Sequence, residues 1–308
     1  MATSSPTRSF ILDFDGTITT KDTISTLFQI ALTNQSSKGN DKSQALQTIL
    51  SEYSADFEIH ISSYTPKKED RVTLQQEIDY QRSLRDVEMR SFNRVSKSGI
   101  FAGLDEEEWY LRAGEAIEQG TVECRLGLRG FLSTIRGRRA LFDDTVAKGR
   151  WGIVSVNFSA NFIKGFLVGW LGDDMVEGND LVECIEILAN EPREEDGVLE
   201  GPMISGQREV IATSDGKLKA MRELLRRWKE DGGEIGQLFY FGDSGTDLEC
   251  LTEADVGVIL SDNQNGPLMD TMKRLKMEVS HIDDYKERDG NALYWAPDFK
   301  AIRSTIFG

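Results

Sequence analysis

The chain has 308 residues, of which 39% are hydrophobic and 29% charged, a composition typical of globular proteins. Its 36 Lys and Arg stand against 52 Asp and Glu, so the formal net charge is −16. Nucleic acids and anionic membrane surfaces select clustered basic residues, and we therefore expect neither as a partner. No apolar run reaches the roughly 18 residues of a membrane-spanning helix.

The cysteines and the N-terminus predict a cytoplasmic protein. The three cysteines are far apart and form no CxxC pair, which argues against a disulfide framework or a zinc cluster. The first nine residues are rich in Ser and Thr and contain no apolar segment of the kind that marks a secretory signal. A monomer or a homodimer is compatible with this composition.

The first predicted element is a buried strand over residues 9–14. Its apolar run leads into Asp13 and Asp15, and Gly16 and Thr17 follow as a turn. A short apolar run of this kind is typical of a strand in a parallel sheet, and it opens into a loop at its carboxyl end.

The next hundred residues predict helices only. Residues 33–44 are polar, which predicts a loop or mobile segment. The following stretch carries apolar side chains at helical spacing among many charges. No run in it resembles a buried parallel strand. We therefore predict a helical domain over residues 21–122, inserted into a core made of residues 1–20 and 123–308.

Strands and helices alternate in the rest of the chain, which predicts an α/β fold with a parallel sheet. Strands are predicted at 151–156, 181–188, 238–242 and 256–260, a hairpin at 201–206, and a helix that begins near Gly216. Open α/β sheets bind ligands at the carboxyl ends of their strands. We expect Asp13, Ser155, Asp243 and Lys217 to meet there.

These side chains suit the chemistry of a phosphate ester. Mg²⁺ prefers carboxylate oxygens and would neutralise Asp13 and Asp243, which repel each other without a cation. Ser155 and Lys217 would hold phosphate oxygens. Asp13 could attack phosphorus as a nucleophile. Asp15 could protonate the leaving oxygen and then activate water.

The same residues resemble the four motifs of the haloacid dehalogenase-like (HAD) superfamily, in order: Asp13-Phe-Asp-Gly-Thr, Ser155, Lys217 and Gly242-Asp243-Ser-Gly-Thr-Asp247. The resemblance implies a Rossmann-like parallel sheet, with Asp13 as nucleophile and Asp15 as general acid and base. It also implies that Asp13, Asp15 through its backbone carbonyl, and Asp243 hold Mg²⁺, and that Asp247 supports the metal site.

Further features resemble one branch of the superfamily. The second acid of the first motif, Asp15, marks phosphatases and phosphomutases, and the helical insertion resembles a C1-type cap. The segment from Ala189 to Gly201 resembles the hairpin region of phosphoserine phosphatase-like members. Ser155-Val156-Asn157 replaces their usual Ser-Gly-Gly and resembles uncharacterised fungal members.

The resemblance predicts a Mg²⁺-dependent phosphatase that hydrolyses a small phosphomonoester through a phospho-aspartyl intermediate. Gly16, Thr17, Val156 and Asn157 join Ser155 as candidates for substrate contact, and Asn157 either orients substrate or shapes its loop. Two alternatives stay open: a non-catalytic phospholigand-binding protein that retains the pocket, and a phosphomutase. The cap arginines, Arg71, Arg82 and Arg85, are expected on solvated helix faces, unless one of them reaches the substrate.

Overall fold

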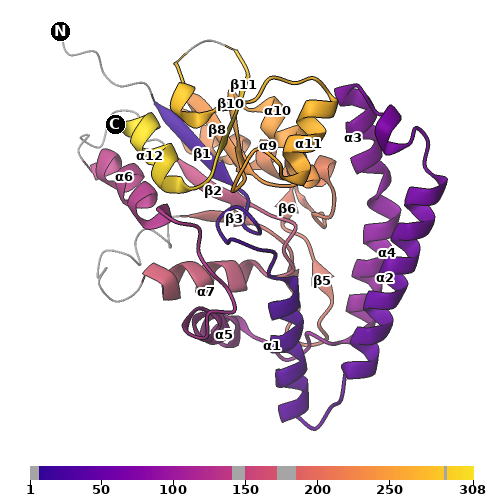
Figure 1. The fold of residues 1–308 in the computed structure, drawn as a ribbon. Helices are drawn as coiled ribbons and strands as arrows, with labels where there is room; N and C mark the ends of the chain where they lie inside the picture. The colour runs from indigo at the N-terminus through magenta and orange to yellow at the C-terminus, as the bar shows by residue number, and fades with distance from the viewer. Residues whose placement is uncertain (1–6, 141–149, 172–184, 288–289) are drawn as a thin grey trace.

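A seven-stranded parallel sheet organises the molecule (Figure 1). The computed structural model describes residues 7–140, 150–171, 185–287 and 290–308. For residues 136–140 it describes the backbone alone. The strand order is β10-β11-β9-β8-β1-β2-β3, and every neighbouring pair is parallel. The strands are β1 (Arg8–Leu12), β2 (Trp151–Val154), β3 (Glu186–Leu188), β8 (Gln237–Gly242), β9 (Val256–Leu260), β10 (Ser280–His281) and β11 (Ala292–Ala296).

The predicted α/β class is confirmed, and four of the predicted strands correspond to β1, β2, β8 and β9. The strand predicted over 181–188 lies partly outside the described residues, and its described end is β3. The edge strand β10 and its neighbour β11 are additional to the prediction. The central strands end side by side, so the segments after β1, β2 and β8 share one edge of the sheet.

Helices cover both faces of the sheet because successive strand residues point to opposite sides. Phe10 and Leu12 of β1 belong to one apolar cluster, whereas Ile11 between them belongs to the other. The first cluster includes side chains of α6 (Leu128–Ala140), α7 (Ala160–Leu171) and α12 (Phe299–Phe307). The second includes side chains of α9 (Ser214–Glu230), α10 (Leu248–Glu253) and α11 (Pro267–Arg274).

The predicted cap, which the structure describes throughout, contains helices and no strand, and an isolated bridge between Thr19 and Cys124 lies just outside it. Its elements are α1 (Ile24–Ser37), α2 (Ser43–Ser63), the 3-10 turn η1 (Lys68–Asp70), α3 (Leu74–Ser83), α4 (Arg85–Ser98) and α5 (Glu106–Glu118). Helices α2 and α4 lie side by side, and α5 packs on α7 of the core (Figure 1). The domain boundaries at 20 and 122 stay predictions.

The loop predicted at 33–44 is wrong in large part, because α1 continues to Ser37 and α2 begins at Ser43. The polar residues there have a structural task. The buried amides of Asn34 and Gln35 donate to the carbonyl of Ala102, at 3.2 and 2.7 Å. Side chains that satisfy backbone carbonyls need not be apolar, so low hydrophobicity was a poor guide to structure here.

Two short hairpins follow β3. The strands β4 (Glu191–Pro192) and β5 (Leu199–Glu200) form the first. The second, β6 (Met203–Ile204) and β7 (Gln207–Arg208), turns at Gly206 and confirms the hairpin predicted there. Among the helices of the described ranges, none is long and apolar enough to cross a membrane.

Candidate active site

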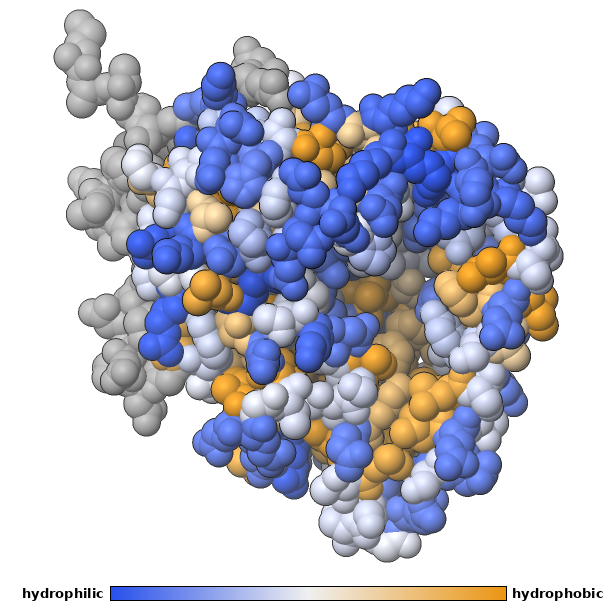
Figure 2. All heavy atoms as spheres, in the orientation of Figure 1, coloured by the Kyte–Doolittle hydropathy of each residue, from blue (hydrophilic) through white to orange (hydrophobic). Residues whose placement is uncertain are grey.

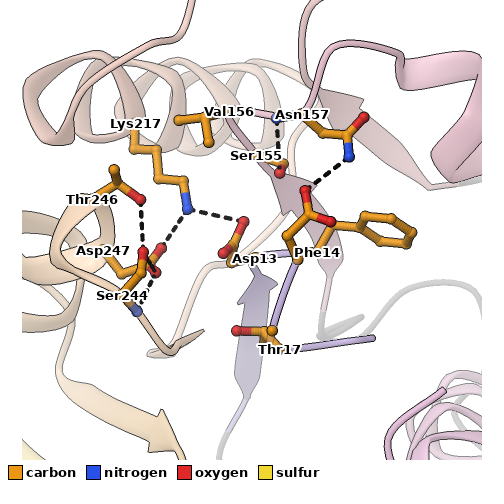
Figure 3. Close-up of polar contacts among 12 residues, drawn as sticks. Asp13, Phe14, Thr17, Ser155, Val156, Asn157, Lys217, Ser244, Thr246 and Asp247 are labelled. Atoms are coloured by element: carbon orange, nitrogen blue, oxygen red, sulfur yellow. Dashed lines mark hydrogen bonds and ion pairs between the residues drawn. The ribbon is translucent and has the colours of Figure 1, made fainter. Parts of the chain in front are cut away.

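A buried lysine joins two of the predicted site carboxylates. Asp13 directly follows β1, and Lys217 lies in the first turn of α9. The Lys217 Nζ lies 2.9 Å from Asp13 Oδ1 and donates to Asp247 Oδ1 at 2.7 Å (Figure 3). Burial disfavours the ammonium form, but the two carboxylates outweigh it and raise the pKa of Lys217. The lysine is therefore charged at neutral pH.

Asp247 is the most heavily hydrogen-bonded carboxylate of the cluster. It ends the 3-10 turn η2 (Gly245–Asp247), which follows β8. One oxygen accepts from Lys217 and from the Tyr240 hydroxyl, and the other accepts from the backbone N–H of Asp243 and from the N–H and hydroxyl of Ser244. These five hydrogen bonds fix the Asp247 side chain in place, and with it the turn and the lysine.

Asp13, Asp243 and Asp247 could hold a metal ion. They offer ligand oxygens that all lie within 4.8 Å of one another. Burial and the charges of Asp247 and Asp243 raise the pKa of Asp13, and burial together with Asp247 raises the pKa of Asp243 to about 7. The single positive charge of Lys217 does not balance the negative charge of three carboxylates that lie this close together. The donor set and its excess of negative charge fit a hard divalent cation.

A tight turn places Gly16 against Asp243. Gly16 has φ of +70°, and a Cβ added to it would lie 2.1 Å from Asp243 Oδ2. The Thr17 hydroxyl lies 3.5 Å from Asp243 Oδ1. Only glycine combines this backbone conformation with so close an approach. The turn thus keeps the loop after β1 in contact with the loop after β8.

We expect Gly16→Ala to be costlier than Gly206→Ala. Both glycines have positive φ, but a Cβ at Gly206 would have nothing within 4 Å. Gly206→Ala is the matched control, and its free energy of unfolding should fall by only about 1 kcal/mol, the cost of a left-handed backbone conformation for alanine. Gly16→Ala should lose at least about 2 kcal/mol in urea unfolding, because it also displaces Asp243. Equal losses in the two variants would contradict this view of the turn.

Arg125 anchors the same turn, and sequence reasoning missed it. Its buried guanidinium donates to the carbonyls of Gly16 and Thr17 at 2.5 and 3.1 Å, and to that of Pro297 at 3.0 Å. It also pairs with Asp262 at 3.1 Å. These partners are more than 100 residues from it in sequence. The sequence around residue 125 contains no local pattern that predicts such contacts.

Asp15 forms a separate polar group with residues of two other segments. Thr23, the residue before α1, donates to Asp15 Oδ1 from its N–H at 2.8 Å and its hydroxyl at 2.6 Å. The amide of Asn157 donates to Asp15 Oδ2 at 2.8 Å. Burial raises the pKa of Asp15 to about 6. Thr23 was not among the predicted site residues.

The loop after β2 carries the remaining predicted residues. Ser155 is fully buried, and its hydroxyl accepts from the N–H of Asn157 at 3.2 Å (Figure 3). Val156 is partly exposed. The side chain of Asn190 holds this loop, since it donates to the carbonyls of Val156 and Asn157, both at 3.1 Å. A side chain from the segment after β3 therefore binds the backbone of the loop that carries these predicted residues.

The cap arginines bind carboxylates. Arg82 pairs with Glu249 of α10, and Arg85 lies 3.3 Å from Asp215 of α9, so both join the predicted cap to the core. Arg71 is 6% exposed and pairs with Glu77 at 2.8 Å. The solvated position expected for Arg71 is therefore wrong, because Glu77 supplies a buried counter-charge.

A cavity of about 670 Å³ lies beside Asp243. It is bounded by the predicted cap from Ile61 to Gln81 on one side and by Asp243–Gly245 and Pro267–Thr271 on the other. A volume of this size accommodates a small-molecule ligand. Away from this cavity, Figure 2 shows the surface hollowed beside α2 and α4, with apolar residues along part of the hollow.

Comparisons with known proteins agree with this architecture. No protein-family model matches the chain. A phosphoserine phosphohydrolase-like protein from Francisella tularensis superposes with a TM-score of 0.50 at 13% identity, over 97% of this chain and 100% of that one. The cytosolic 5'-nucleotidase IIIB superposes with a TM-score of 0.49 at 13% identity, over 87% and 78%. The chain has the HAD-like fold, which confirms the predicted fold class.

A curated sequence relative matches over most of the chain. The mitochondrial bifunctional TH2 protein of Arabidopsis thaliana is 25% identical over 272 residues, or 82% of this chain. The chain spans 39% of the length of that protein. The resemblance of Ser155-Val156-Asn157 to fungal members stays a prediction.

Proposed function

We propose that the chain is a Mg²⁺-dependent phosphatase that hydrolyses a small phosphomonoester through a phospho-aspartyl intermediate at Asp13. The observation that carries the proposal is the pairing of Asp13 with the buried Lys217, within one cluster with Asp243 and Asp247. The Lys217 ammonium orients the Asp13 carboxylate, and the metal site lies beside it. This arrangement suits attack on a phosphate dianion, because the two positive charges offset the repulsion between the carboxylate and the phosphate. The HAD-like fold agrees with this chemistry.

Asp13, Asp243 and the backbone carbonyl of Asp15 would hold the metal, and Asp247 would support them, since its oxygens already accept five hydrogen bonds. Bound Mg²⁺ supplies positive charge that neutralises the carboxylates and the phosphate. Lys217 and the Ser155 hydroxyl would bind phosphate oxygens. Asp13 then attacks phosphorus, Asp15 gives a proton to the leaving oxygen, and the same carboxylate later takes a proton from the attacking water.

Phosphate release from a panel of esters tests the proposal. The panel contains 4-nitrophenyl phosphate, phosphoserine, phosphocholine, thiamine and pyridoxal phosphates and a nucleoside monophosphate, each with Mg²⁺ and with EDTA. We expect release from at least one ester with Mg²⁺ and none with EDTA. If Mg²⁺ and phosphate raise the melting temperature but no ester is hydrolysed, the result favours an ester outside the panel or the phospholigand-binding alternative.

Mg²⁺ binding should strengthen as pH rises from about 6 to about 8. The raised pKa of Asp13, and the pKa of Asp243 near 7, mean that the folded protein without metal holds protons that a cation must displace. Affinity should change by up to about tenfold per pH unit for each displaced proton. Calorimetry in buffers of different ionisation enthalpy measures the proton release. Binding without proton release at pH 6 would contradict this.

A further inference from the structure

We propose that Asn157 and Thr23 are positioning residues that aim the carboxyl group of Asp15 at the leaving oxygen, and that the transferred proton resides on Asp15 Oδ2. This inference rests on the proposed function. It assigns to Asn157 a role beyond the two considered from the sequence, which were contact with the substrate and shaping of its own loop.

The hydrogen bonds to the two oxygens of Asp15 are unequal. Oδ1 accepts two bonds from Thr23, at 2.8 and 2.6 Å, whereas Oδ2 accepts one bond from Asn157, at 2.8 Å. Each carboxylate oxygen has two lone-pair positions. The two donors of Thr23 occupy those of Oδ1, and one position on Oδ2 is left to carry and deliver a proton. Asn157 therefore orients the oxygen that does the chemistry.

Asn157 can hold that direction because it is itself held. It is 4% exposed, its Oδ1 accepts from the N–H of Ser159 at 3.0 Å, and its Nδ2 also donates to the Thr23 hydroxyl at 2.9 Å. The side chain of Asn190 binds its carbonyl. The network thus joins four segments: the loop after β1, the start of α1, the loop after β2 and the segment after β3. A carboxyl group bound on both oxygens cannot rotate freely, as a positioned acid requires.

The proton matters most when the leaving group is poor. In the first half-reaction an Asp13 oxygen bonds to phosphorus, the bond from phosphorus to the leaving oxygen breaks, and that oxygen keeps the electron pair and takes the proton of Asp15. In the second, water gives a proton to Asp15 and bonds to phosphorus, and the bond from phosphorus to Asp13 breaks. An alkoxide needs the proton of the first half-reaction, whereas 4-nitrophenolate leaves without it.

The test compares kcat/KM for two esters, because this ratio reports only steps up to the first irreversible one. The esters are 4-nitrophenyl phosphate and the alkyl ester of the panel that the wild type hydrolyses best. In Asn157→Ala we expect the alkyl value to fall by about 10²-fold and the aryl value by less than about threefold. Asp15→Asn should give the largest difference between the losses for the alkyl and the aryl ester. Asn161→Ala is the control: its side chain does not contact Asp15, so it should change neither kcat/KM value.

Thr23→Val provides a second variant if Asn157→Ala does not fold. It removes the hydroxyl and keeps the N–H bond, so the alkyl value should again fall more than the aryl value, and Thr23→Ser should restore both. Equal losses for the two esters in a folded, active variant would overturn the positioning role while the proposed function stands. Absence of hydrolysis in the wild type would instead overturn the proposed function.

Discussion

Asp13→Asn should lower phosphate release at least about 10³-fold while the protein remains folded. The amide has the size of the carboxyl group but cannot attack phosphorus as an anion, and removal of a nucleophile costs this much or more in enzymes that form covalent intermediates. Burial raises the pKa of Asp13, so a neutral side chain at that position imposes no charge on the core. The substitution removes the ion pair of Asp13 with Lys217, but Lys217 keeps Asp247 as its partner, so the protein should stay folded without metal.

Asp231→Asn is the matched control for this variant. Asp231 is exposed, lies at the end of α9 before β8 begins, and is thus at the opposite end of the strands from the site. It should retain wild-type phosphate release. Activity near the wild-type level in Asp13→Asn, in protein freed of wild-type contamination, would refute Asp13 as the nucleophile.

Lys217→Met should be among the most destabilising substitutions in the chain. Lys217 is fully buried between Asp13 and Asp247, so its removal leaves two buried carboxylates without their cation. Breaking a buried ion pair on one side costs about 3–5 kcal/mol. Urea unfolding at pH 8 without metal should show a loss of this size, and phosphate release should be lost too.

The pH dependence of this loss has a defined sign. Removal of the lysine raises further the pKa of Asp13 and Asp243, which burial already holds above their unfolded values. A carboxyl group with a raised pKa binds its proton more tightly in the folded state, so stability increases as pH falls toward the unfolded pKa. The deficit of Lys217→Met should therefore be smaller at pH 5 than at pH 8.

Lys219→Met is the control, two residues further along α9. Lys219 is half exposed and pairs with Glu209 at the surface, so its loss should change the free energy of unfolding by less than about 0.5 kcal/mol. Equal effects of the two substitutions would show that the pairing of Lys217 with Asp13 and Asp247 does not contribute as described.

Buried strands were the most predictable part of the fold. In a parallel sheet covered on both faces, strands are continuous apolar runs, and β1, β2, β8 and β9 were visible as such. Segment 33–44 was misread because its polar side chains bind carbonyls of a distant turn. Strand β10 has two residues and β11 alternates in burial, so no comparable apolar run marks either of them.

The site was predictable where its residues directly follow strands. Asp13, Ser155 and Asp243 lie where the strand ends place them, and the structure puts Lys217, rather than Lys219, against Asp13. The residues that hold them were not predictable. Arg125 and Thr23 act through contacts between distant segments, which no local spacing encodes.

The phosphoenzyme itself tests the central claim most directly. The wild type would be mixed with its best ester and Mg²⁺, quenched in acid during turnover and reduced with borohydride, which converts an aspartyl phosphate to homoserine. Mass spectrometry of the peptide that contains residue 13 then gives the answer. The account predicts homoserine at position 13, and none in Asp13→Asn or without ester. Phosphate release by the wild type with an unmodified Asp13, or with the label on another residue, would contradict it.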